Sequence, residues 1–177
     1  MGNKVAFSVP MQCKKEVLGE GPAFQEAICS MLQTAKVFEG FNQSECAYFA
    51  KHMRAYQVPA DGTIYHEGER DGYFSVLIEG RIAVYKEDSD DQVKFLNTIQ
   101  PGSIFGEISV IDNRPTSASL IAETDVVIVD MSRESFQQCV SENPTFGVHL
   151  LNLVARILCA RLRSVSGRLV DYIDVWG

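Results

Sequence analysis

The sequence has little of what metal sites and disulfide frameworks are built from. Its 177 residues include three histidines, one tryptophan and five cysteines, and no Cys-x-x-Cys pair occurs. The cysteines are Cys13, Cys29, Cys46, Cys139 and Cys159. Because an odd number of widely spaced cysteines is typical of neither a disulfide framework nor a zinc site, we expect reduced thiols packed in the core of a cytoplasmic protein.

Long apolar runs and excess positive charge are also missing. No uninterrupted apolar run reaches the ~18 residues of a membrane helix, and the N-terminus lacks the apolar stretch of a secretory signal. Lysine and arginine number 16 against 23 acidic residues, so the net charge is −7. Such a field repels nucleic acid and anionic membranes, and we expect neither as a direct partner.

What the sequence does contain is enough apolar material for one folded domain. Hydrophobic residues make up 46% of the chain, which excludes intrinsic disorder, and the length suits a single domain. Residues 1–22 show no periodicity and are expected to form a loose N-terminal arm, followed by one domain over 23–177. Amphipathic helices are predicted for 23–36 and for about 42–54, the second beginning with a capping box.

From about residue 55 to 131 the pattern changes to short β-like runs separated by turn residues. Runs of this kind at spacings of about 8–12 residues favour an antiparallel sandwich or barrel. The acidic segment 87–91 is expected at a solvated hairpin tip. The clearest runs are 73–78, 81–85, 93–96, 118–121 and 126–129.

Helical pattern returns over about 132–173. Ser132 is a plausible N-cap, and Pro144 is expected to open a last helix that reaches about Ile173 if Gly167 does not end it. Its apolar stripe follows an eleven-residue repeat, which keeps one line of side chains on a nearly straight helix. We expect the C-terminal half to pack against a second copy as a homodimer, the alternative being packing onto its own barrel. The stripe contains Leu151, Val154, Leu158, Leu162, Val165, Leu169 and Ile173.

The most informative segment follows the predicted strand that ends at Phe105. Gly106 lets the backbone come close to a ligand, and the first amides of a helix that begins beside Glu107 bind anions. A carboxylate at that place accepts hydrogen bonds from a sugar hydroxyl. Small residues after Pro115 leave further backbone N–H groups for a phosphate. The segment therefore predicts a site for a sugar phosphate.

These residues resemble the cyclic-nucleotide-binding domain family, and the resemblance covers residues 24–173. It rests on ordered matches to the family's strands, turns and phosphate-binding cassette: Asp61–Ile64, Glu67–Glu69, Phe74–Gly80, Pro101–Gly102 and Gly106–Ser109. It implies a mainly β fold, an antiparallel β-jelly-roll (double-stranded β-helix) with N-terminal helices and a long C-terminal helix. It also implies a regulatory sensor that is not an enzyme, needs no cofactor and binds cAMP or cGMP.

The resemblance further assigns roles to the residues of the cassette. In the family the cassette glutamate holds the ribose 2′-hydroxyl, which implies that role for Glu107, next to Gly106. The alternative is a structural role, in which the Glu107 carboxylate caps neighbouring amides. The cyclic phosphate is held by backbone amides of the short helix and of the loop after the proline. In this sequence those residues are Ile108, Ser109, Thr116 and Ser117.

The sequence departs from the family directly after Pro115, where Thr116 replaces the hallmark arginine. Truncating one member of a buried phosphate–guanidinium pair costs about 2–5 kcal/mol. Arg114 is the nearest guanidinium, and it either ligates the phosphate or points to solvent. Two functions therefore stay open: a sensor of cyclic nucleotides, or a degenerate domain that serves as a dimerisation or protein-interaction module without the nucleotide.

An enzyme and a metal site are not expected. A jelly-roll metal site of the cupin kind needs a His-x-His pair, but His66 is followed by Glu67 and Gly68. His52 and His149 fall on predicted helices, and scattered histidines form neither a metal site nor an acyl-transfer triad. Because no helix-turn-helix or kinase sequence follows the last helix, we expect either a stand-alone dimeric regulator that acts on an effector protein in trans or a cut-down receptor. Direct DNA binding is not expected.

Overall fold

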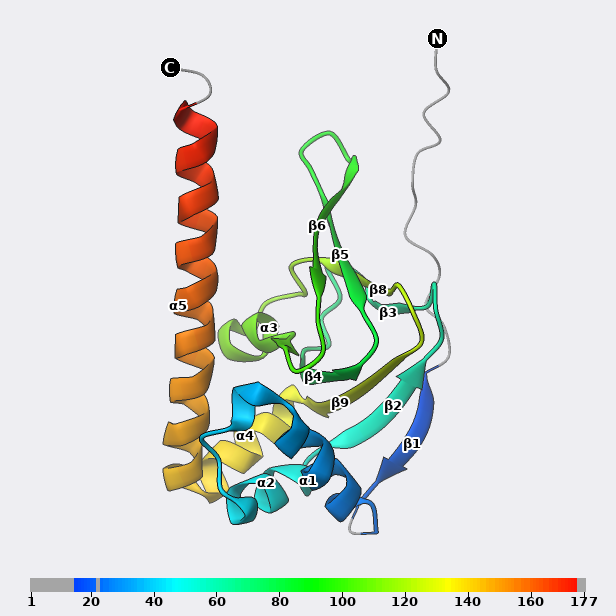
Figure 1. Cartoon of the computed structure of the whole chain (residues 1–177), viewed down its shortest axis with the longest axis vertical. Coiled ribbons are helices and arrows are strands. Elements are labelled where there is room, and N and C mark those ends of the chain that lie inside the picture. The colour runs from blue at the N-terminus through cyan, green and yellow to red at the C-terminus, as the bar shows by residue number, and fades with distance from the viewer. Residues whose placement is uncertain (1–14, 22, 175–177) are drawn as a thin grey trace. The chain divides into compact units, whose positions relative to one another are not determined.

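The computed structural model describes residues 15–21 and 23–174 and divides the chain into two compact units, 1–138 and 139–177. The first unit contains two antiparallel sheets, with strand orders β1-β2-β9-β4-β7 and β3-β8-β5-β6 (Figure 1). This confirms the predicted mainly β fold. The strands are β1 (Glu16–Glu20), β2 (Arg54–Val58), β3 (Thr63–Tyr65), β4 (Tyr73–Glu79), β5 (Ile82–Glu87), β6 (Val93–Ile99), β7 (Ile104–Phe105), β8 (Ser119–Ala122) and β9 (Val126–Ser132).

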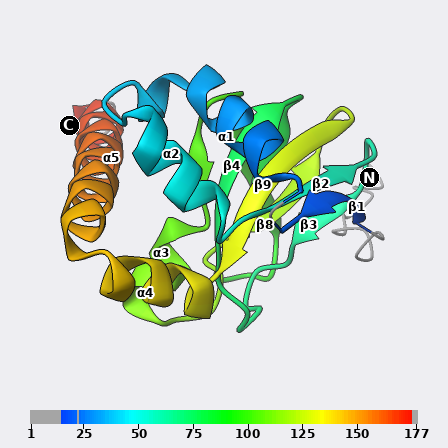
Figure 2. The same ribbon diagram turned by 90° about the horizontal axis from the view of Figure 1, so that it is seen from below.

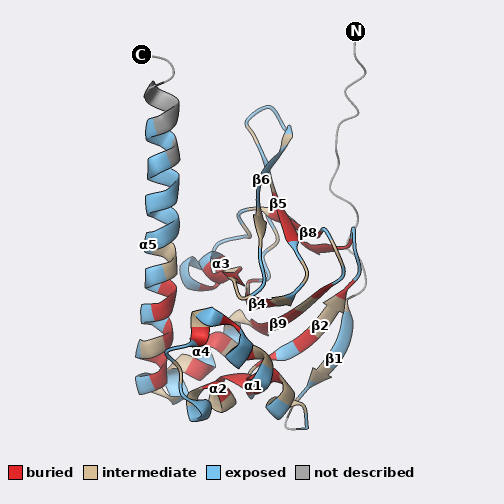
Figure 3. Cartoon of the chain, viewed as in Figure 1, coloured by how far each residue is buried: buried red, intermediate tan, exposed pale blue. Residues whose placement is uncertain are grey.

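The core between the two sheets comes from the alternation of side chains along the strands. Residues two apart face the same side of a strand, and Val58, Leu77, Ile82 and Ile128 point into one buried cluster with Ile64. Figure 3 shows this burial running along β4, β5 and β9. The short β-like runs that indicated a sandwich or barrel in the sequence therefore correspond to strands of these two sheets.

Two helices cover the outer face of the β4–β9 region, as Figure 2 shows. α1 (Gln25–Thr34) and α2 (Gln43–Ala50) are joined by a short 3-10 helix, η1 (Lys36–Phe38). The predicted capping box is confirmed, because the Asn42 side chain accepts from the Glu45 N–H at 3.0 Å and the Glu45 carboxylate accepts from the Asn42 N–H at 2.9 Å. Phe49 of α2 then contacts Phe74 of β4, with ring centroids 5.7 Å apart.

Part of the expected loose arm is a strand. Glu16–Glu20 forms β1, which pairs with β2 at the edge of its sheet, and Glu20 forms a salt bridge to Arg54 at 2.9 Å. Little in the sequence indicates this strand, because Val17 and Leu18 are exposed and an edge strand of this kind shows no apolar alternation. The remainder of the expected arm, residues 1–14, lies outside the described residues.

The acidic segment 87–91 lies at the turn of the β5–β6 hairpin, as predicted. The Asp88 carboxylate closes this turn by accepting hydrogen bonds from the N–H groups of Gln92 and Asp90, both at 2.9 Å. These backbone hydrogen bonds lower the pKa of Asp88, with a smaller contribution from Lys94.

The helical end of the chain also matches the prediction. α4 (Arg133–Glu142) follows Ser132, whose hydroxyl oxygen accepts from the Ser135 N–H at 3.2 Å. α5 (Pro144–Asp174) continues through Gly167. In the predicted stripe, Val154 is buried and Leu158 half-buried, whereas Leu151 is exposed; the side chain of Ile173 lies outside the described ones. Further along, Leu162, Val165 and Leu169 are 67%, 62% and 60% exposed.

The cysteine expectation is correct for most of the described thiols and wrong for one. Cys29, Cys46 and Cys139 are free and buried, and burial raises the pKa of Cys29 and Cys46. Cys159 is free but exposed on α5, where it lies off the buried face of the helix, so it is not a core residue. Cys13 lies outside the described residues.

Candidate functional site: a cassette at the end of the barrel

The candidate site begins where β7 ends and a short helix, α3 (Glu107–Asp112), starts. Gly106 joins them with φ +76°, in the left-handed region, and a Cβ built there would lie 2.1 Å from the Tyr73 carbonyl oxygen. Only glycine fits both the conformation and the space. Glu107 follows at once and is fully buried, at 0% exposure. The fold thus places the two residues that the sequence singled out at one sharp turn.

The first turn of α3 is held from both sides. The Ser109 hydroxyl donates to the Gly106 carbonyl at 2.9 Å, and the Ser109 carbonyl accepts from Nη2 of Arg133 at 2.9 Å. Arg133, at the start of α4, also donates to the Arg70 carbonyl at 3.3 Å. The sequence carried no signal for Arg133, since it lies 24 positions from Ser109. Ile108, by contrast, exposes its side chain, so only its backbone is a candidate ligand.

Thr116 occupies a different place from the one expected. Its hydroxyl donates to the His66 carbonyl and accepts from the Glu69 N–H at 3.0 Å. Its own N–H donates to the Glu69 carbonyl at 2.8 Å. The hydroxyl and the amide that were expected to reach a phosphate are therefore both engaged within the protein, where they fasten the loop after Pro115 to the loop after β3.

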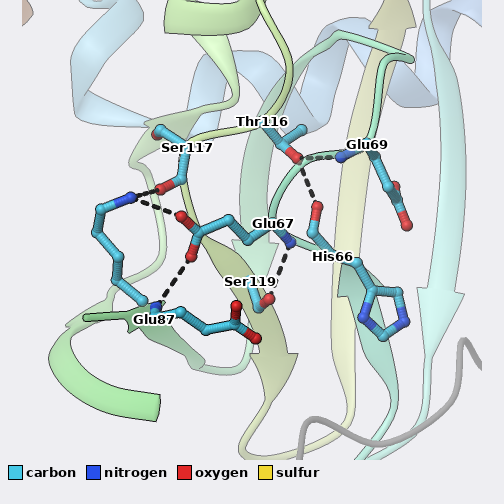
Figure 4. A network of polar contacts seen from close by, with 8 residues as sticks. His66, Glu67, Glu69, Glu87, Thr116, Ser117 and Ser119 are labelled. Atoms are coloured by element: carbon cyan, nitrogen blue, oxygen red, sulfur yellow. Dashed lines mark hydrogen bonds and ion pairs between the residues drawn. The ribbon is translucent and has the colours of Figure 1, made fainter. Parts of the chain in front are cut away.

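A second set of polar contacts surrounds Ser117 (Figure 4). Lys86 Nζ donates to the Ser117 carbonyl at 2.7 Å and to Glu67 Oε1 at 2.6 Å. The other oxygen of Glu67 accepts from the Glu87 N–H at 3.0 Å, and the Glu67 N–H donates to the Ser119 hydroxyl at 2.9 Å. Lys86 of β5 thus contacts the loop and is paired with a carboxylate. Because Lys86 is exposed and Glu67 only half-buried, solvent screens this ion pair, and it positions the loops more than it stabilises the fold.

The structure defines no contact between the side chain of Arg114 and the cassette. It is exposed, and its backbone N–H donates to the Asp112 carboxylate at 3.0 Å. The site therefore combines Gly106, Glu107 and the first turn of α3, while the cation defined near the following loop is Lys86. Sequence reasoning missed Lys86; the signal available was its place two residues after the inward-facing Val84 on β5.

The residues described by the structure contain no cluster of three or more histidine, cysteine, aspartate or glutamate side chains that could hold a metal ion. His66 is half-buried, and its backbone carbonyl accepts a hydrogen bond from the Thr116 hydroxyl. The arrangement of the cassette is that of a binding site, with a buried carboxylate and helix amides at a glycine turn.

Comparison with known proteins identifies the class. Residues 56–143 match the family described as Cyclic nucleotide-binding domain, so this part of the chain belongs to that family, as the cassette motif predicted. A solved cyclic nucleotide-binding domain from Methylobacillus flagellatus has a TM-score of 0.76 and 27% identity, covering 88% of each chain.

Among individual proteins, the chain is similar to a CRP-like cAMP-activated global transcriptional regulator of Mycobacterium tuberculosis, with 28% identity over 143 residues. That match covers 81% of this chain and 62% of the relative, so the chain spans less than two thirds of the regulator's length. A regulatory subunit of a cAMP-independent protein kinase A from Trypanosoma cruzi, bound to guanosine, shares the fold: its TM-score is 0.62, at 20% identity over 75% of this chain and 50% of that one.

One segment within the described residues, Pro144–Gly167 of α5, is long and apolar enough to cross a membrane by length and composition. This is weak evidence for a membrane span, because a helix that packs in the core of a soluble protein passes the same test.

Proposed function

We propose that this chain is a cytoplasmic regulatory sensor domain whose cassette binds a cyclic mononucleotide, cAMP or cGMP. The observation that carries the proposal is the fully buried carboxylate of Glu107, placed at the N-terminus of α3 directly after a turn that only glycine can make. A carboxylate there accepts hydrogen bonds from ribose hydroxyls, and the amides of Ile108 and Ser109 lack intrahelical partners and suit a phosphate. The M. tuberculosis relative is described as cAMP-activated, which supports the same ligand class.

The loop after Pro115 favours a second candidate ligand, an uncharged nucleoside. Thr116 replaces the arginine that would neutralise a phosphate, and its hydroxyl and amide already bond to His66 and Glu69. The nearby Lys86 is paired with Glu67. A nucleoside retains the ribose that Glu107 would hold and needs no cation. The T. cruzi structure, bound to guanosine in a cAMP-independent kinase subunit, supports this chemistry.

Isothermal titration with four ligands separates these functions. We expect saturable binding of cAMP or cGMP if the cassette accepts a phosphate, and of guanosine or adenosine alone if it holds only the ribose and base. If none of the four ligands produces binding heat at millimolar concentration, both binding proposals are overturned. That result would favour the remaining alternative, a domain that serves only in dimerisation or protein interaction, acting on an effector protein in trans.

Replacing Glu107 by glutamine is expected to weaken whichever ligand binds by about 10- to 100-fold, because a hydrogen bond to a charged group contributes about 1.5–3 kcal/mol. The measurement is the dissociation constant by titration calorimetry, with circular dichroism to confirm folding. Glu39→Gln, which neutralises an exposed carboxylate, is the matched control and should leave the affinity unchanged. Equal affinity in the two variants would remove Glu107 from the site.

We further propose that α5 forms a homodimer through its exposed apolar stripe. Leu162, Val165 and Leu169 lie on consecutive turns and are more than half exposed in the single chain; an apolar line of this kind on one helix favours a two-fold pair. Leu162→Glu is expected to convert the dimer to a monomer, measured by light scattering after gel filtration. Ser164→Glu adds the same single negative charge on the other side of the helix and should keep the dimer. A wild-type protein that runs as a monomer at high micromolar concentration would contradict the proposal.

A further inference from the structure

Three tyrosines from three strands surround the ammonium group of Lys15, the residue that precedes β1. The Nζ atom lies 4.5 Å from the ring centroid of Tyr65, 5.4 Å from that of Tyr73 and 6.0 Å from that of Tyr56. Tyr65 and Tyr73 stack with centroids 5.8 Å apart and ring planes 4° from parallel. We call Tyr56, Tyr65 and Tyr73 the tyrosine cage.

A buried carboxylate completes the cage. Asp130, on β9, is 2% exposed and lies in register between Arg54 of β2 and Ser75 of β4. Directly paired residues of antiparallel strands share one face of the sheet, so these polar side chains and the cage belong to the same inner face. The Tyr65 hydroxyl, which lies 2.7 Å from the Ser75 hydroxyl, also lowers the pKa of Asp130. Lys15 and Arg54 are the positive charges that act on Asp130.

This combination is specific for an organic cation. Aromatic faces within about 6 Å attract an ammonium group through their quadrupoles, and the attraction strengthens where water is excluded. A lone buried carboxylate costs free energy unless a cation or hydrogen bonds compensate it. Both requirements are met by one ammonium group, whereas an anion or an apolar ligand would add nothing to the compensation that Arg54 gives Asp130.

We propose that the tyrosine cage and Asp130 form a binding site for a primary alkylammonium group, and that its occupant is Lys15 of the same chain. The N-terminal segment is thereby held on the barrel by an internal ligand as well as by the pairing of β1 with β2. The site is next to the cassette but distinct from it: a Cβ on Gly106 would lie 3.8 Å from the Tyr65 ring and 2.1 Å from the Tyr73 carbonyl oxygen. The proposal does not depend on the ligand of the cassette.

The direct test empties the cage and offers it a free ligand. In Lys15→Ala, n-butylammonium, which reproduces the lysine side chain, should bind saturably in the millimolar range and shift the tyrosine ring resonances in NMR spectra. The wild-type protein, whose cage is occupied, should bind it at least tenfold more weakly. n-Butanol, of the same shape without the charge, should not bind. Absence of saturable n-butylammonium binding by folded Lys15→Ala would overturn the proposal.

A second measurement uses the wild-type protein and needs no variant. Acetylation by a dilute amine-reactive ester should modify Lys15 at least tenfold more slowly than Lys51, which is exposed after α2, because an ammonium held between rings and a carboxylate is rarely available as the free amine. Equal acetylation rates for the two lysines would also overturn the proposal.

Discussion

Replacing Thr116 by arginine is expected to raise the affinity for cAMP or cGMP by about 30-fold or more. A guanidinium paired with a buried phosphate contributes about 2–5 kcal/mol, and the position directly after Pro115 follows the cassette where the cyclic phosphate would lie. The substitution also releases the amide of Glu69 and the carbonyl of His66 from the Thr116 hydroxyl, which offsets part of the gain. Titration calorimetry with both nucleotides and with guanosine measures the change.

The control for this substitution is Thr116→Val, which keeps the shape, removes the hydroxyl contacts and adds no charge. If charge is what the wild-type loop lacks, only the arginine variant gains affinity, and it gains for the cyclic nucleotides but not for guanosine. Equal gains in affinity in the two variants would mean that the hydrogen bonds of Thr116 to His66 and Glu69 keep the wild-type loop from contacting the ligand. No gain in either would contradict a phosphate site beside this loop.

The fold was predictable because its signals are local in the sequence. The short β-like runs with their turn residues, the Asn42 capping box and the helical pattern of α5 each depend on residues a few positions apart, and each corresponds to an element of the structure. β1 was missed because an edge strand with exposed Val17 needs no apolar alternation. Cys159 was misplaced because the burial of free cysteine is an average tendency, which the face of a long helix overrides.

The candidate site was predictable only in part, for the same reason. Gly106 and Glu107 are adjacent, so the turn and its carboxylate were visible as a motif. The contacts of Thr116 with His66 and of Lys86 with Ser117 join residues 50 and 31 positions apart, and no short pattern reports such pairs. The net charge of −7 was equally uninformative about the site. A net charge does not show which cation faces the loop after Pro115, and a phosphate ligand would depend on that cation.

As the pH rises from about 4 to 7, Asp130 should lower the free energy of unfolding by about 2–4 kcal/mol. Burial is the main cause that raises the pKa of Asp130 from 3.8 to about 6, against the opposing effects of Lys15, Arg54 and the hydrogen bond from Tyr65. A carboxyl whose pKa is raised by folding stabilises the folded state fully below its unfolded pKa. That contribution is lost as the pH rises through the folded pKa.

Burial sets the direction of this effect, and Lys15, Arg54 and Tyr65 oppose it. The groups around Asp130 are Lys15, Arg54, Tyr56, Tyr65, Tyr73 and Ser75. Asp130→Asn cannot titrate, so the difference in unfolding free energy between variant and wild type should change by the same 2–4 kcal/mol across this window, in favour of the variant at pH 7. Urea unfolding at several pH values measures it. Asp90→Asn, at the exposed hairpin tip, is the control and should keep a constant difference from wild type. A constant difference for Asp130→Asn as well would show that this carboxyl titrates normally, and that the charge beneath the tyrosine cage is compensated far better than its burial implies.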